Sequence, residues 1–409
     1  MPNRPFLRIL LRLFCFSLIL TAIVFALDIA LFDDSTVTPV WKAVRSQSSE
    51  PADVLFVGNS HTYASLDDRV ISQALDKNAQ ILRCSSANGG IVAAMLEAYL
   101  HYDVPELVVL ECNPFMVDNY DTMRGNLRGI VYQSFDGIPG YWQKAKALCS
   151  VLDYENVPAG VFQLFRPTGM WSRWQKSPSS APGYEPYHSY TFQYDYVASE
   201  LEDYYRIPAD QTFQGALLPA NQKALDRIIA LSEELDFELW LIVAPVGHYA
   251  DGYQQDMRRL YAISQSCDRI TLFDNSMQQL STIGLTARDF YDAGHLCRRG
   301  AEKYTRHMIG LLASHYHVQP DYSNILAYRN EEVIPSSSSM QLQMECYGDA
   351  LYQFCYNDAH GNVVETGFSH VNTLDLPADV LPQNVTVQMK LVADPDGEIL
   401  TCAFMDEEE

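Results

Sequence analysis

Basic residues are scarce in this 409-residue chain. It has 28 lysines and arginines against 51 aspartates and glutamates, which gives a formal net charge of −23. Nucleic-acid binding depends on lysine and arginine that neutralise phosphates, so this balance argues against a nucleic-acid partner. Charged residues make up 19 % of the chain and hydrophobic residues 48 %, which argues against a disordered protein.

Closely spaced cysteine pairs are also missing. The nine cysteines are dispersed, with no CxxC pair and no zinc-finger spacing, so we expect neither a structural metal nor a cofactor. Export from the cell would permit a disulfide between Cys346 and either Cys355 or Cys402. Free buried thiols are the alternative, because a domain of this size folds without crosslinks.

A long apolar run occurs only at the N-terminus. As a helix, residues 6–32 would extend about 40 Å, enough to cross a hydrocarbon core of about 30 Å. Basic residues before the run and acidic residues after it favour a cytoplasmic N-terminus and an extracellular body. The sequence thus predicts a single-pass anchor over 1–34. A cleaved signal peptide with its apolar part at 13–27 is the alternative.

Short apolar runs ended by turn residues alternate with helical patterns across residues 52–320. This alternation predicts a parallel sheet covered by helices on both faces, in which ligand sites lie beyond the carboxyl ends of the strands. The predicted strands are 54–57, 81–84, 107–110, 238–244 and 270–273.

Residues 115–215 interrupt that alternation. The segment carries Trp142, Trp171, Trp174 and a series of tyrosines over 184–205, and we expect an insertion packed over the strand ends. Its aromatic residues would form either a platform for sugars or a small satellite core.

Two further segments differ in composition from the α/β region. Residues 35–51 are predicted to be a polar linker that leads away from the membrane. After a second linker, Pro-Ser-Ser-Ser-Ser at 335–339, short strands separated by turns predict a small Ig-like β-sandwich over 336–409.

Two groups of residues could provide a nucleophile and its base. Ser60 follows the first predicted strand in Gly-Asn-Ser-His, where a turn would hold its hydroxyl above the sheet. Asp292 precedes His295 by three residues, a spacing that lets the carboxylate orient the imidazole as a base for a serine. Ser60 as a helix cap and His295 in a surface turn are the non-catalytic alternatives.

Donors for a negatively charged oxygen follow the next two strands. Gly89 and Gly90 come after the second strand and Asn113 after the third. A glycine N–H, the Asn113 side-chain amide and the Ser60 N–H could converge on one oxyanion. The alternative is that these residues serve only in turns.

Taken in this order, the motifs around Ser60, Gly90, Asn113 and His295 resemble the conserved blocks of the SGNH (GDSL-like) hydrolase superfamily. The resemblance covers residues 52–316. The resemblance implies a flavodoxin-like three-layer α/β/α fold, with Ser60, Asp292 and His295 as catalytic triad and Ser60, Gly90 and Asn113 as oxyanion hole. The anchor and the aromatic insertion are similar to exported members that act on surface polysaccharides, of the alginate O-acetyltransferase and DltD types.

The chain departs from the usual SGNH blocks in their flanking residues. Asn59 replaces the aspartate of the first block, Glu111-Cys112-Asn113-Pro114 lacks the glycine and aspartate of the third, and Leu296 replaces a proline. The departures leave the substrate open. His61 and His248 have no spacing that would make a metal site with His295.

The sequence therefore predicts an extracytoplasmic serine acyl-transfer enzyme. It would be an O-acetyltransferase or acetylesterase acting on cell-surface polysaccharide, anchored in the bilayer and working with a membrane protein that supplies acyl groups. The alternative is a non-catalytic polysaccharide-binding or scaffold subunit of a membrane acylation complex.

Overall fold

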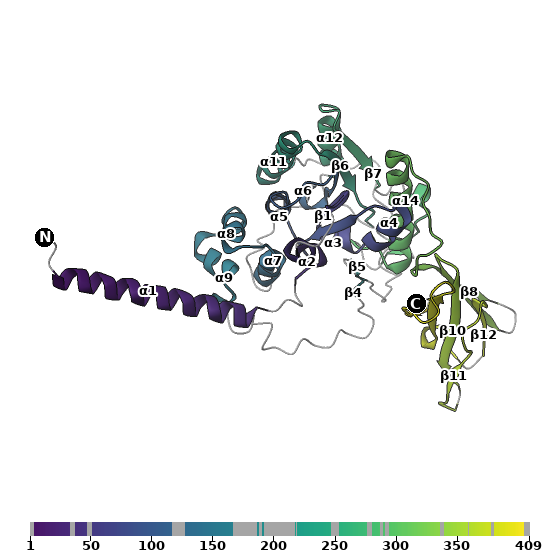
Figure 1. Cartoon of the computed structure of the whole chain (residues 1–409). Helices are drawn as coiled ribbons and strands as arrows, with labels where there is room; N and C mark the ends of the chain where they lie inside the picture. The colour runs from purple at the N-terminus through teal and green to yellow at the C-terminus, as the bar shows by residue number, and fades with distance from the viewer. Residues whose placement is uncertain are drawn as a thin grey trace.

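The structure is a computed structural model, and Figure 1 shows an α/β body with a long N-terminal helix and a separate β region at the C-terminus. It describes residues 4–32, 37–46, 51–116, 127–166, 186–187, 190–191, 217, 219–246, 253–275, 280–286, 289–290, 294–335, 339–358, 360–377 and 380–404.

A parallel five-stranded sheet forms the centre of the body, as predicted. Its strands are β1 (Val54–Gly58), β2 (Ala79–Arg83), β3 (Leu107–Glu111), β6 (Glu238–Val243) and β7 (Ile270–Asp274), hydrogen-bonded in the order β2-β1-β3-β6-β7. β1 and β3 are buried over their whole length. Their near-continuous apolar sequence matches a sheet that is covered on both faces.

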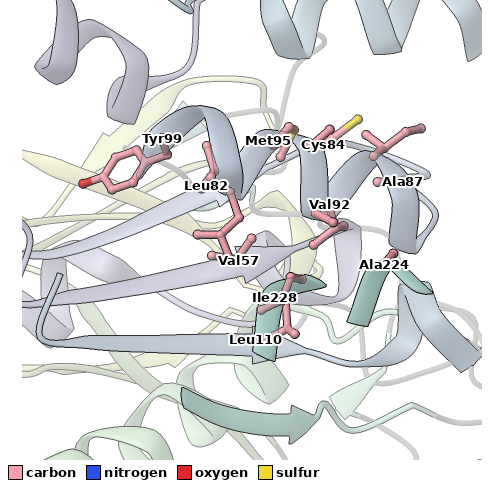
Figure 2. Close-up of a cluster of buried hydrophobic side chains, with 14 of the residues drawn as sticks. Val57, Leu82, Cys84, Ala87, Val92, Met95, Tyr99, Leu110, Ala224 and Ile228 are labelled. Atoms are coloured by element: carbon pink, nitrogen blue, oxygen red, sulfur yellow. The ribbon is translucent and has the colours of Figure 1, made fainter. Parts of the chain in front are cut away.

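Helices cover both faces of this sheet. One face packs on α5 (Gly89–Tyr99) and α11 (Pro219–Leu235), where Val57, Leu110 and Ile228 share one buried cluster (Figure 2). The other face packs on α4 (Asp68–Leu75) and α14 (Arg298–Tyr316). The other helices of this body are α3 (Ser60–Tyr63), α6 (Asn113–Met116), α12 (Tyr253–Ser264) and α13 (Leu280–Ile283).

The N-terminal segment forms one long helix, α1 (Arg4–Leu31). Its Phe6–Leu31 stretch is long and apolar enough to cross a membrane, with a mean hydropathy of 2.5, and a signal sequence has the same properties. The structure differs from the predicted linker over 35–51, because α2 (Pro39–Ser46) buries Val40 and Trp41 in the core.

The stretch 127–166 of the predicted insertion packs beside α5 and the end of α1 (Figure 1). It forms α7 (Leu127–Asp136), α8 (Tyr141–Cys149), η2 (Tyr154–Asn156), α9 (Val157–Val161) and η3 (Gln163–Phe165). We refer to α7 through η3 as the helical insert. Its buried apolar residues join the same cluster as α5, so this part packs as core together with the α/β body.

Half of the aromatic residues in the predicted insertion lie outside the described residues. Trp171 and Trp174 lie outside the described residues. Of the tyrosine-rich stretch, the structure describes only the short strand pair β4 (Pro186–Tyr187) and β5 (Tyr190–Thr191). Trp142 is described and lies exposed at the start of α8. The sugar platform therefore stays a prediction.

The C-terminal region consists of two antiparallel sheets with one shared buried cluster. One sheet has the order β11-β10-β13-β14 and the other β12-β9-β8. The strands are β8 (Tyr328–Pro335), β9 (Met340–Cys346), β10 (Ala350–Asn357), β11 (Val363–Glu365), β12 (Thr373–Leu376), β13 (Thr386–Leu391) and β14 (Leu400–Ala403), with η8 (Pro382–Asn384) between β12 and β13.

This region begins earlier than the predicted boundary at residue 336. β8 pairs antiparallel with β9, with Pro335 opposite Met340. The serine-rich stretch after Pro335 therefore connects two paired strands and does not link two domains. The polar sequence Arg-Asn-Glu-Glu in β8 hides the alternation that would have predicted a strand. All nine cysteines are free thiols. The alternative of free buried thiols fits five of them, Cys84, Cys112, Cys297, Cys346 and Cys402, whereas Cys15 and Cys149 are exposed.

Candidate active site

The carboxyl end of β1 turns directly into the short helix that carries Ser60. Asn59 is the N-cap of α3, and its side-chain oxygen accepts a hydrogen bond from the His61 N–H at 2.9 Å. Gly58 allows the tight turn, because a Cβ there would lie 2.1 Å from Thr62 Oγ1 and 2.9 Å from Glu111 Cβ. The cap and the glycine fix the direction of Ser60.

Ser60 and His295 meet at the end of the sheet, although 235 residues separate them in sequence. His295 Nε2 lies 2.7 Å from Ser60 Oγ, within hydrogen-bond distance. Both side chains are half-buried, so they are shielded but still reachable from solvent. A serine hydroxyl that hydrogen-bonds an imidazole nitrogen is the arrangement by which histidine activates a nucleophile. Asp292, the predicted third member, lies outside the described residues.

The segment before His295 is held to α14 by a buried carboxylate. Asp289, fully buried, accepts hydrogen bonds from Arg299 Nε at 2.9 Å and Lys303 Nζ at 2.8 Å. Its backbone oxygen accepts from the Cys297 N–H at 3.0 Å. A Cβ at Gly300 would lie 2.0 Å from that same oxygen, so α14 approaches the segment closely. These contacts fix the chain on both sides of His295.

Asn113 follows the neighbouring strand, β3, and contacts Asn59, the residue before Ser60. Its side-chain oxygen accepts a hydrogen bond from Asn59 Nδ2 at 3.3 Å, and its backbone N–H donates to Glu111 Oε1 at 2.9 Å. With its oxygen used by Asn59, the amino group of Asn113 is the half of the amide that can serve an external acceptor. Asn59, the departure from the usual first block, thus positions the predicted oxyanion donor.

Gly90 occupies the first turn of α5, at the carboxyl end of β2 on the other side of β1. The Asn88 side chain caps this helix by accepting from the Ile91 N–H at 3.1 Å. The N–H groups in the first turn of a helix have no acceptor within that helix, and Gly90 is half-buried rather than enclosed. Ser60, Gly90 and Asn113 therefore follow three adjacent parallel strands.

Glu111 is a fully buried carboxyl immediately beneath the site. Burial raises its pKa to about 8, against the opposing effect of hydrogen bonds from the backbone N–H groups of Asn113 and Ala244. Near neutral pH this side chain is thus largely uncharged while it holds the backbone of Asn113.

This raised pKa predicts a pH dependence of stability. An unfolded glutamate has a pKa of about 4.3, so from about pH 4.5 to 8 the folded state binds more protons than the unfolded state. The contribution of Glu111 to stability is therefore lost as the pH rises through that window. We expect Glu111→Gln to reduce this loss, because the amide stays neutral and keeps an oxygen for the Asn113 N–H. Chemical denaturation at several pH values would measure it.

The matched control for that variant is Glu155→Gln, which makes the same charge change at an exposed position of η2. It is expected to keep the wild-type pH profile. If Glu111→Gln and Glu155→Gln show the same fall in stability between pH 5 and 8, the assignment of Glu111 as a buried, uncharged carboxyl is wrong.

His61 lies next to the site in a way that the sequence did not indicate. Its ring stacks on that of His295, with centroids 5.2 Å apart and an angle of 30° between the planes. In the part of the chain that the structure describes, no group of three histidine, cysteine or acidic side chains could hold a metal ion. His248 lies outside that part.

The site thus combines residues that were predicted with neighbours that were not. Ser60, His295 and Asn113 lie together, and Gly90 follows an adjacent strand. The roles of Asn59 and Glu111 were missed, because only their departure from the family pattern was visible in the sequence. No protein-family model matches the chain, and no curated protein matches it either.

Proposed function

We propose that this protein is an extracytoplasmic serine acyl-transfer enzyme of the SGNH type. The observation that carries the proposal is the 2.7 Å contact between Ser60 Oγ and His295 Nε2 at the carboxyl end of a parallel sheet. Asn113, which is bonded to the residue before the serine, and Gly90, in the helix after the adjacent strand, supply the donors that acyl transfer needs.

In the first half of the reaction, Ser60 Oγ attacks the carbonyl carbon of an ester while its proton passes to His295 Nε2. The carbonyl oxygen becomes an oxyanion, which the N–H groups of Ser60 and Gly90 and the side-chain amide of Asn113 stabilise. When the intermediate collapses, the leaving oxygen takes the proton from His295 and an acyl group remains on Ser60.

In the second half, a hydroxyl attacks the carbonyl carbon of the acyl-enzyme and His295 accepts its proton. The bond from that carbon to Ser60 Oγ then breaks, and His295 returns the proton to Ser60 Oγ. A sugar hydroxyl gives an O-acylated polysaccharide and defines a transferase, whereas water gives a free acid and defines an esterase. Asp292 is assigned to orient His295, three residues along the chain, and to stabilise its charged form.

The fold supports the superfamily assignment. Numbered in chain order, the five parallel strands lie side by side as 2-1-3-4-5, which is the order of flavodoxin-like folds. The two C-terminal sheets share one buried cluster, which supports the proposed β-sandwich. The long apolar α1 supports a single-pass anchor with a cytoplasmic N-terminus and an extracellular body.

The anchor bears on the substrate and the partner. An enzyme held at the outer face of a membrane meets surface polysaccharide as its acceptor. A single span cannot itself carry acyl groups across the bilayer, so a transferase would work with a membrane protein that supplies them.

A fluorophosphonate probe, which reacts with activated serines, tests the proposal. We expect the purified full-length protein to be labelled and Ser60→Ala not to be labelled. Ser266→Ala, which removes an exposed serine after α12, is the matched control and should be labelled like wild type. Labelling that survives in Ser60→Ala would refute Ser60 as the nucleophile.

The same protein, given an acetyl ester and a glycan, separates the remaining possibilities. Acetylated glycan identifies a transferase, and acetate released without acetylated glycan identifies an esterase. Glycan binding with neither labelling nor turnover would replace the proposal with the non-catalytic binding subunit.

A further inference from the structure

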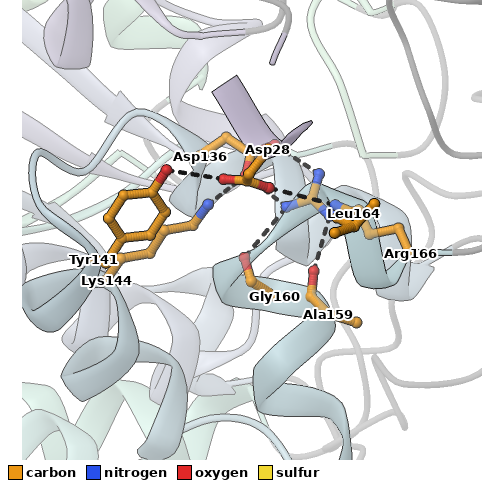
Figure 3. A network of polar contacts seen from close by, with 8 residues as sticks. All are labelled: Asp28, Asp136, Tyr141, Lys144, Ala159, Gly160, Leu164 and Arg166. Carbon is orange, nitrogen blue, oxygen red and sulfur yellow. Dashed lines mark hydrogen bonds and ion pairs between the residues drawn. The ribbon is translucent and has the colours of Figure 1, made fainter. Parts of the chain in front are cut away.

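The outer end of α1 is in contact with the helical insert. Phe25 packs edge-to-face on Tyr141, with ring centroids 4.8 Å apart, and lies 5.7 Å from the ring of Phe162. Three residues further along α1, Asp28 is buried and accepts hydrogen bonds from Tyr141 Oη at 3.0 Å and the Leu164 N–H at 3.3 Å (Figure 3). The body of the protein therefore reaches back along α1 at least to Phe25.

These contacts locate the end of the proposed membrane span. At 1.5 Å per residue, the 20 residues of 6–25 span about 30 Å, the thickness of a hydrocarbon core. The exposed large apolar side chains of α1 run from Phe6 to Ile29, whereas Asp28, which accepts its hydrogen bonds from the insert, is enclosed by protein. A span of this length that starts at Phe6 ends near the level at which the insert packs on Phe25.

Two exposed aromatic side chains lie at this same level. Trp142, next to Tyr141 at the start of α8, is 77 % exposed. Phe165 in η3 is 52 % exposed, and its ring lies 5.7 Å from Phe162, which itself contacts Phe25. Tryptophan concentrates at the boundary between hydrocarbon and water, and phenylalanine is common on the apolar face of segments that lie in this interface. In water alone, these two side chains would have no apolar partner at their exposed faces.

We propose that the helical insert is an interfacial membrane-binding surface, with Trp142 and Phe165 inserted among the outer-leaflet lipids beside α1. The inference goes beyond acyl transfer and rests on the proposed anchor. Its ligand is the phospholipid interface itself. Since the insert packs on α5 of the α/β body, the surface would fix the orientation of the Ser60–His295 site relative to the membrane.

The insert is braced well enough to transmit that orientation. Asp136 accepts hydrogen bonds from Lys144 Nζ at 2.7 Å and from Arg166 Nη1 at 2.8 Å, and all three side chains are buried. Arg166 also donates to the backbone oxygens of Ala159 and Gly160, as Figure 3 shows. This network ties α7, α8, α9 and the end of η3 into one unit.

Depth measurement with spin labels tests the inference on the full-length protein in phosphatidylcholine–phosphatidylglycerol vesicles. Labels are placed by Trp142→Cys and Phe165→Cys after the exposed Cys15 and Cys149 are replaced. Leu18→Cys within α1 is the bilayer reference, and Tyr261→Cys on α12 is the aqueous reference. Frequent collisions of a spin label with oxygen indicate that the label lies in lipid, and frequent collisions with a water-soluble nickel chelate indicate that it lies in water.

We expect labels at positions 142 and 165 to shift from the Tyr261 value towards the Leu18 value when vesicles are added. If the labels at positions 142 and 165 keep the Tyr261 value while the label at position 18 reports a lipid environment, the proposed interfacial surface is wrong and the proposed anchor is supported. If position 18 also reads water, the anchor fails and this inference fails with it. Fluorophosphonate labelling of Ser60 is independent of both outcomes.

Discussion

Replacing His295 with alanine is expected to lower kcat for ester turnover by about 10⁴- to 10⁶-fold, as losing the histidine of a serine–histidine pair does elsewhere. The physical reason is that Ser60 Oγ then has no base at hydrogen-bond distance, whereas in the wild-type protein His295 Nε2 lies 2.7 Å away. Initial rates with a chromogenic acetyl ester measure this effect in the full-length protein.

The loss should not be additive with that of the nucleophile. Because Ser60 and His295 act on the same proton, Ser60→Ala/His295→Ala should be no slower than the worse single variant.

Two other histidines provide the controls. His61→Ala, which removes only the ring stacked on His295, should lower kcat by about tenfold or less, the value of one aromatic contact. His101→Ala, which removes an exposed histidine after α5, should match wild type. Equal losses for His61→Ala and His295→Ala would contradict the assignment.

Replacing Glu331 with alanine is expected to destabilise the protein by about 3–5 kcal/mol, since it strands a buried charge. Arg298 Nη2 donates to Glu331 Oε2, and the two side chains are only 1 % and 5 % exposed. The same Nη2 donates to Ala403 O at 2.8 Å, and the guanidinium lies 4.3 Å from the ring centroid of Tyr328. One arginine at the start of α14 thus holds β8 and β14.

Denaturant unfolding of the full-length protein in detergent, followed by tryptophan fluorescence and circular dichroism, measures this loss. Glu332→Ala is the matched control: it changes the next residue, which is exposed, and should stay within about 0.5 kcal/mol of wild type. Arg298→Met/Glu331→Leu, which removes both charges, should recover much of the stability. A Glu331→Ala protein as stable as Glu332→Ala would mean that the ion pair does not hold the C-terminal sheets.

The parallel sheet was predictable because its strands are continuous apolar runs with turn residues directly after them. All five predicted runs overlap the observed strands to within two residues at each end. β8 and α2 were not predictable in the same way. β8 carries Arg-Asn-Glu-Glu, and α2 is a short helix of mixed composition whose Val40 and Trp41 become buried only by long-range packing, Trp41 beside Gly137.

Within the candidate site, predictability followed local geometry. Ser60 and Asn113 each come two residues after a strand, and Gly90 lies in the first turn of the helix that follows β2. Adjacent parallel strands end at the same edge of the sheet, so the placement of these residues at that edge follows from strand order. Asn59 was visible only as a departure from a pattern. Its bond to Asn113 depends on the register between β1 and β3, in which Val57 lies opposite Leu110.

Sequence alone, through local periodicity and the residues at strand ends, was enough to predict the apolar N-terminal helix, the parallel sheet and the residues that could do chemistry. Folding decided the rest. It placed His295 on Ser60 across 235 residues, turned Glu111 into a neutral support for Asn113, and packed the helical insert against the end of α1. Those relations come from long-range packing and from burial that changes the charge of a carboxyl, and neither is recorded in the order of neighbouring residues.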